Sequence, residues 1–195
     1  MANPKHVKLV MRGPKYVNEH RKKHPYETLD LSGANLRNAN LREANLSNSN
    51  LEKADLSLAN LVDANLQKAN LKNASLLGAY LIGANLSEAN LTEAKLGAAN
   101  LGGANISNAT FYKADLTRTH LGGANIYDAD FSKATLIGAS LWNAQLSRSI
   151  FKEANLALSI LFNANLSKAD FSKASLFEAN LSGADLSQTN FSNAD

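Results

Sequence analysis

Large apolar side chains recur at every fifth residue along most of the chain. From Leu31 to Phe191, all 33 of these positions hold Leu, Phe or Ile. A small residue stands two places before the next large one, and 28 of these 33 positions hold Ala. A step of five residues rotates side chains by about 140° around an α-helix and alternates faces along a strand. The period therefore predicts neither a long helix nor a long strand.

Each five-residue unit is instead predicted to combine a short extended piece with a turn. The small residue and the large residue after it are two apart, so an extended chain points both side chains to the same side. The residue between them is usually Asn or Asp, as at Asn35 and Asp55. Repeated bends of one hand, with Leu and Ala always inward, wind the chain into a solenoid around a narrow apolar axis.

A second, longer period in the sequence predicts the number of sides. The Phe residues at the large position are spaced by four units and should stack in one column: Phe111, Phe131, Phe151, Phe171 and Phe191. We therefore expect four sides per coil and about eight coils. Such coils depend on their neighbours for stability, as in other one-dimensional repeat folds.

The segment ADLSLANLVDANLQKANL and its continuation resemble the pentapeptide repeat family, in which a small residue, Asn or Asp, a large apolar residue and two variable residues alternate. The resemblance implies an all-β solenoid, a right-handed quadrilateral β-helix. It covers the chain from residue 30 onward. The Asn or Asp position departs from the pattern most clearly at Tyr80, Lys95, His120, Gln145, Ile150 and Ile160.

Residues 1–29 lie outside the repeat and form a second predicted unit, a cap on the β-helix of residues 30–195. Pro14 favours the first turn of a helix and Pro25 disfavours its continuation, so we predict a short helix between them. Val17 should lie over the first coil and protect its edge from further strand pairing. At the other end no cap is visible, and the open coil is a candidate surface for dimerisation.

The cap is basic, whereas the repeat is nearly neutral. Residues 1–29 hold seven of the 20 Lys and Arg but only two of the 17 Asp and Glu. Arg21, Lys22, Lys23 and His24 form a candidate basic patch for nucleic acid. No base-reading motif accompanies them, so a solvated helix is the favoured interpretation. His20 and His24 have the spacing of a helical metal pair, but a third ligand is missing and we predict no metal site.

The sequence predicts neither an enzyme nor a cofactor protein. The chain has no Cys, which excludes disulfides and Cys-ligated metals. Its Asp residues occupy the Asn/Asp position of the repeat, where they are expected to bond the turn backbone. A solenoid interior filled by Leu, Phe and Ala leaves no pocket for a small-molecule substrate. No stretch has the length of a membrane span or the apolar core of a secretory signal, so we expect a cytoplasmic protein.

Several outward positions hold apolar residues where Ser, Asn, Lys and Glu prevail elsewhere. Glycines at 97, 102 and 122 leave the adjoining stretch nearly bare. Such clusters are typical of binding sites for partners, although scattered apolar residues would also be tolerated. The candidate partner surface consists of Ile137, Trp142, Ile160, Phe162 and Phe177.

The favoured function is therefore that of a non-catalytic interaction protein, a rigid rod that binds a protein partner or itself. The family resemblance implies an alternative, in which a rod of DNA-like width mimics duplex DNA and modulates DNA gyrase or topoisomerase. That function requires strong negative charge, which the repeat lacks. A second alternative is contact with nucleic acid through the basic cap, which would weaken steeply with salt.

Overall fold

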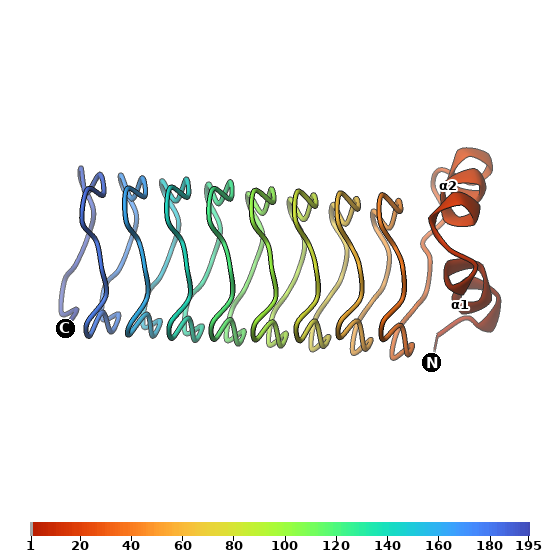
Figure 1. The fold of residues 1–195 in the computed structure, drawn as a ribbon, viewed down its shortest axis with the longest axis horizontal. Helices are drawn as coiled ribbons and strands as arrows, with labels where there is room; N and C mark the ends of the chain where they lie inside the picture. Colours follow the sequence, from red (N-terminus) through yellow and green to blue (C-terminus); the bar gives the residue numbers. More distant parts are fainter. Residues whose placement is uncertain (1) are drawn as a thin grey trace.

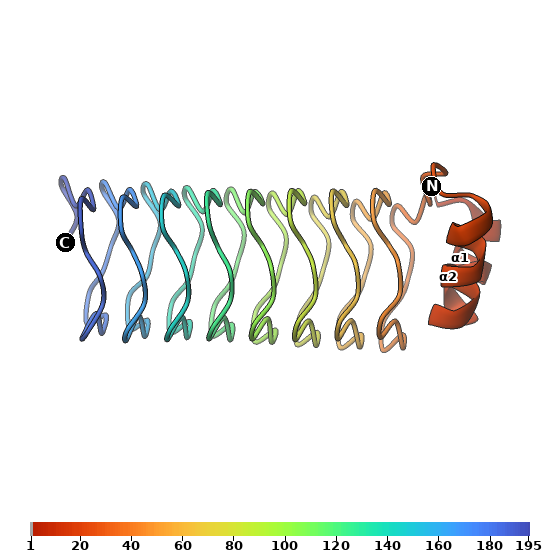
Figure 2. The ribbon, with the colours of Figure 1, turned by 90° about the horizontal axis from the view of Figure 1, so that it is seen from above.

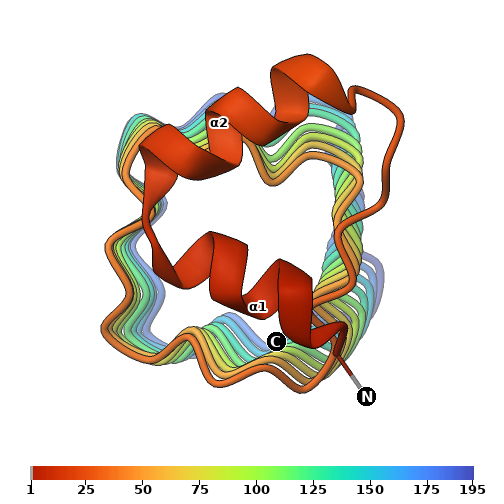
Figure 3. The same cartoon turned by 90° about the vertical axis from the view of Figure 1, so that its right-hand side faces the viewer.

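The computed structural model describes residues 2–195 as a straight rod of stacked coils with two helices at its N-terminal end (Figures 1 and 2). Each coil pairs in parallel with the next through equivalent residues, from Asp30 with Asn50 to Asp170 with Asn190. Viewed along the rod, the coils superpose as a four-sided outline (Figure 3). The predicted solenoid with four units per coil is thus present, and each side pairs through one residue only. Its right-handed sense stays a prediction.

In a unit that has Asn or Asp before its large residue, all five N–H groups can find acceptors, and this explains the repeat. In one typical unit, the N–H groups of Asp55 and Leu56 donate to the coils before and after, at 2.9 and 2.7 Å. The Leu58 N–H also reaches the next coil at 2.9 Å, and the Ala54 N–H closes the preceding turn at 3.0 Å. The remaining N–H, of Ser57, donates to Oδ1 of Asp55 at 2.9 Å. Asn or Asp precedes the large residue because its side chain satisfies this last donor.

The interior consists of stacked apolar layers. The large side chains are fully buried from Leu31 to Phe171, and Ala side chains fill the space between them. The Phe rings stack in one column as predicted, with neighbouring ring centroids 4.6 to 5.4 Å apart. In the last coil, which has a neighbour on one side only, Leu186 is 43% exposed.

Every turn of the repeat places its third residue in the left-handed region of backbone space. At these positions φ lies between +53° and +71°, and 26 of the residues are not glycine. A residue with a Cβ atom is disfavoured there by roughly 1–2 kcal/mol. The bonds between coils and the burial of the interior must offset this strain at turn after turn.

The cap consists of α1 (Pro4–Met11) and α2 (Pro14–Lys23), which lie across the end of the rod (Figure 3). Helix α2 begins at Pro14 and ends before Pro25, as predicted. Helix α1 was not predicted. Its signals are Asn3, whose side chain accepts the Lys5 N–H at 3.0 Å, and a proline in the first turn. Val10 and Val17 are buried against the core. Neither helix is long and apolar enough to cross a membrane.

Two adjacent glycines allow the strain of the turns to be measured. Gly103 has φ +63° and its added Cβ would meet no atom within 4 Å, whereas Gly102 lies outside the left-handed region. We expect Gly103→Ala to lower the free energy of unfolding by about 1–2 kcal/mol. Gly102→Ala should cost less than this, because its φ is unstrained and its added Cβ closely meets only Asn100 Oδ1, at 3.3 Å. Chemical denaturation of both variants tests this, and equal effects would contradict the assignment of strain to φ.

Candidate interaction surface

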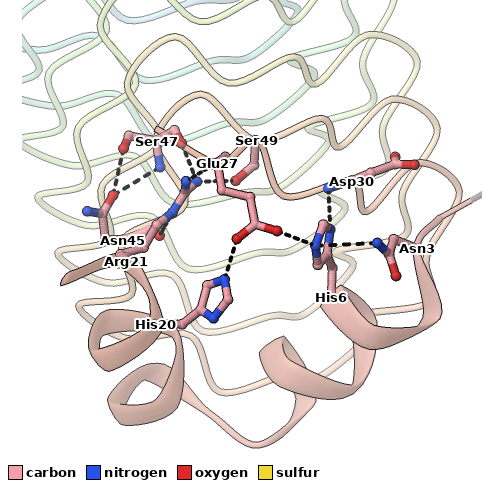
Figure 4. A network of polar contacts seen from close by, with 9 residues as sticks. All are labelled: Asn3, His6, His20, Arg21, Glu27, Asp30, Asn45, Ser47 and Ser49. Atoms are coloured by element: carbon pink, nitrogen blue, oxygen red, sulfur yellow. Dashed lines mark hydrogen bonds and ion pairs between the residues drawn. The ribbon is translucent and has the colours of Figure 1, made fainter. Parts of the chain in front are cut away.

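The structure separates the four residues of the predicted basic patch. Lys22, Lys23 and His24 are exposed, but Arg21 is only 5% exposed. Its guanidinium turns toward the first coil, where Nε donates to the Asn45 carbonyl at 3.2 Å (Figure 4). The prediction that Arg21 belongs to an exposed patch is therefore wrong. Its charge is used inside the cap, and three exposed basic residues remain.

Arg21 and Asn18 take the place of a coil that would precede the first one. Within the rod, the carbonyl groups at the places equivalent to Asn45 and Ser47, such as those of Asn65 and Gln67, accept N–H groups from the preceding coil. The first coil has no such neighbour. The Arg21 guanidinium donates to the Asn45 and Ser47 carbonyls instead. The Asn18 side chain donates to the Glu43 carbonyl at 3.0 Å and accepts the Asn45 N–H at 2.7 Å. The cap thus satisfies an open sheet edge by hydrogen bonds as well as by apolar cover.

Glu27 joins both helices to the entrance of the first coil (Figure 4). Its two carboxylate oxygens lie 3.0 Å from His6 Nε2 and 2.7 Å from His20 Nε2. The Asp30 N–H donates to His6 Nδ1 at 2.9 Å, so the neutral His6 ring carries its proton on Nε2, toward Glu27. Hydrogen bonding from His20, and then from His6, lowers the pKa of Glu27 below its ordinary value of 4.5.

A lowered carboxyl pKa means that Glu27 stabilises the cap only while it is ionised. This contribution is complete above pH 4.5, the ordinary value, and is lost as the pH falls through the lower pKa of the folded protein. We expect Glu27→Gln to lower the thermal midpoint at pH 7, with the difference from wild type shrinking below pH 4.5. Glu93→Gln, at an exposed turn, is the matched control and should change little. A Glu27→Gln effect that persists unchanged in acid would contradict this account.

The exposed apolar residues gather on one side of the rod, the apolar side. On this side, every twentieth residue from 41 to 181 faces inward, and every twentieth residue from 40 to 180 faces outward. A column of turns lies at each of the two corners that bound the side. Phe177 is 63% exposed and Trp142 is 50% exposed. All five residues of the predicted partner surface lie on this side, and Ile137 is half-buried. Other large apolar residues exposed there are Leu58, Leu77, Tyr80, Ile82 and Leu158.

Turns on the apolar side often lack their side-chain acceptor. At its two corners, eight units hold no Asn or Asp before the large residue. Within residues 2–195, no side chain accepts the following N–H in these units, whereas Val62, Gly102 and Ala157 at the same corners are capped. These donors need another acceptor, such as water or a partner. The uncapped residues are all apolar or glycine: Leu77, Ile82, Gly97, Gly122, Ile137, Trp142, Phe162 and Phe177.

The surface of the apolar side is uneven as well as apolar. The Trp142 indole lies over Gly122 in the preceding coil, where an added Cβ atom would clash with the indole Nε1. At one corner, a shallow depression of about 330 Å³ is lined by Leu58, Leu77 and Gly97. Its other lining residues are Arg37, Ser57, Gly78 and Ala98.

Sequence reasoning missed the depression, because it depends on side chains in four successive coils. Leu58 and Leu158 were not included in the predicted surface, yet they are 43% and 52% exposed. Their signal is chemical: both occupy the left-handed turn position, where Asn, Lys and Glu prevail. Ile150, also outside the prediction, is 40% exposed on another side.

Within residues 2–195, no group of three or more His, Cys, Asp or Glu is placed to hold a metal ion. The rings of His20 and His24 lie with centroids 4.5 Å apart and are tilted by 30°. His20 is instead bonded to Glu27. The arrangement at the cap is one of structural hydrogen bonds.

Comparison with known proteins agrees with the geometry of the repeat. The family described as pentapeptide repeats (8 copies) matches residues 30–61, 59–97, 94–132, 129–167 and 161–193. No match among curated protein sequences reaches significance.

Solved structures of other repeat proteins are similar to this chain. HetL, a pentapeptide repeat protein involved in heterocyst differentiation regulation in the cyanobacterium Nostoc sp. PCC 7120, is 38% identical over 85% of this chain and 81% of its own, with a TM-score of 0.40. Rfr23 from the cyanobacterium Cyanothece 51142 is 31% identical over 49% and 62%, with a TM-score of 0.31. QnrB1, a plasmid-mediated fluoroquinolone resistance protein, is 20% identical over 84% and 90%, with a TM-score of 0.44.

Proposed function

Because the chain belongs to the pentapeptide repeat family, we propose that it is a non-catalytic interaction protein that binds a protein partner through the apolar side. The observation that carries this proposal is the coincidence of two features on one side. Exposed aromatic and aliphatic residues lie there, and the backbone donors of the same turns have no side-chain acceptor. Protein interfaces commonly combine aromatic anchors with direct hydrogen bonds between the partners, and both can form at such turns.

The carboxylates of the repeat support a structural use over a catalytic one. Hydrogen bonds from the side chain and the backbone N–H of Ser57 lower the pKa of Asp55. Asp130 and Asp170 accept turn N–H groups in the same way, at 2.8 and 2.9 Å. A carboxylate with a lowered pKa, such as that of Asp55, is poorly suited to proton transfer near neutral pH.

The two alternative functions receive less support from the structure. Mimicry of duplex DNA needs a negative surface, and residues 30–195 carry thirteen basic and fifteen acidic of the 20 and 17 in the chain. Nucleic-acid binding by the cap would use Lys22, Lys23 and His24 without Arg21, which is buried. Both stay predictions.

Capture of partners from a lysate of the producing organism tests the proposed function. The immobilised wild type is compared with a Trp142→Asp, Phe162→Asp double variant, which places two charges on the apolar side. We expect the variant to retain at least about tenfold less of the captured protein, because truncated aromatic anchors typically cost this much binding.

The matched control carries the same charges at equivalent turn positions on another corner, Ser132→Asp and Ser172→Asp. It should capture as much as wild type, and circular dichroism must show all three proteins folded. If both double variants capture the same proteins in equal amounts, the apolar side is not the binding surface.

A further inference from the structure

We propose that the partner of the apolar side is a second copy of this chain, docked antiparallel, with Phe177 of each copy in the depression beside Leu77 and Ala98 of the other. This inference rests on the proposed function, since it names the partner of the same surface. Three observations support it: the placement of a protruding ring and a depression on one corner, the charges beside them, and the area available.

Phe177 and the depression belong to the same corner of the rod. Residues 77 and 177 hold equivalent turn positions five coils apart, in a ladder that pairs each residue with its equivalent in the next coil. At about 4.8 Å per coil, they are separated by roughly 24 Å. Phe177 is the most exposed large apolar residue of the repeat, at 63%, and the depression is lined mainly by Leu and Gly.

A twofold axis across this corner brings the ring and the depression together twice. An axis perpendicular to the rod, between Thr117 and Ile137, exchanges the coil of Leu77 with the coil of Phe177. A twofold interface uses the same patch on both copies, so a protrusion on one copy must meet a depression on the other. Because the coils are evenly spaced and straight, a match at one end is repeated at the other.

The charges on this corner are compatible with such a pair. Arg37 lies on the rim of the depression, and Glu178 directly follows Phe177. Docking brings these opposite charges to the same rim, which favours the antiparallel orientation over the parallel one. Between the two contacts, from Gly97 to Leu158, the corner carries one charged side chain, Arg118. The axis between Thr117 and Ile137 brings the Arg118 side chains of the two copies near each other, so repulsion between the copies is confined to this one pair of like charges, which salt screens.

The available area suits a weak dimer. Six coils, from residue 77 to residue 178, face each other across this axis and extend over roughly 29 Å at about 4.8 Å per coil. With a contact about 15–20 Å wide, each copy buries on the order of 400–600 Å², which is below the roughly 800 Å² per partner of a standard interface. We therefore expect a dimer that forms at micromolar concentration and dissociates on dilution.

A charge swap tests the geometry directly. Phe177→Glu places a charge on the ring position, and Ala98→Lys places the opposite charge in the depression. Both changes suit the fold, since Glu52 holds the same turn position as Phe177 and Lys53 the same left-handed position as Ala98. Each variant alone should be monomeric by analytical ultracentrifugation at about 100 µM, where wild type is dimeric. An equimolar mixture should form heterodimers, because one contact is then wild-type and the other pairs Glu with Lys.

Single cysteines provide a second readout that does not depend on affinity. The chain has no Cys, so Ala98→Cys and Phe177→Cys each introduce the sole thiol. Mild oxidation of the mixture should give a disulfide-linked heterodimer, with much less homodimer from either variant alone. A wild type that is monomeric at about 100 µM, or a charge-swap mixture that stays monomeric, would overturn the inference. The capture of another protein through Trp142 and Phe162 would then still support the proposed function.

Discussion

The fold depends on one constraint, the equal length of every coil. It places the Leu56 N–H 2.7 Å from a carbonyl of the next coil, and the same bond recurs along the rod. It also stacks each inward side chain on one of the same kind, which yields the column of Phe rings. Because the interior is narrow and its layers are in contact, small residues are required between the large ones. Equal coils also align every outward position in a straight column. A residue type that recurs once per coil therefore forms a continuous surface of that chemistry along the rod.

A β-ladder of this kind leaves unpaired backbone groups at its ends and one N–H without a backbone acceptor in each turn. At the N-terminal end, the side chains of Arg21, Asn18 and His6 in the cap form hydrogen bonds with backbone groups of the first coil. At the turns, Asn and Asp satisfy the N–H that the ladder leaves over. Where they are absent on the apolar side, the remaining donors and the exposed apolar side chains occur together. The same backbone chemistry thus explains both the regular surface and its exception.

The repeat could be predicted from the sequence because its signal is summed over many units and has no competing interpretation. The two periods of the sequence were sufficient for the coil, the Phe column and the role of Asp55 in its turn. Helix α1 was missed because it is short and because only one residue, Asn3, signals its N-cap. The burial of Arg21 could not be predicted, since it depends on carbonyl groups brought near by a turn 24 residues later. The five candidate surface residues were found on one side because the longer period is itself a map of the sides, whereas the depression needed side-chain positions from neighbouring coils.

The coil register, and not the particular residues, holds the rod together. Deletion of residues 101–105 removes one complete unit and leaves every Leu, Ala and Asn downstream in phase. Deletion of residues 102–105 removes one residue fewer and shifts the whole downstream repeat out of phase. We predict that the five-residue deletion unfolds in a single cooperative transition close to that of wild type, whereas the four-residue deletion unfolds at markedly lower denaturant or in separate steps. If chemical denaturation followed by circular dichroism gives the same transition for both, the register is not what the structure depends on.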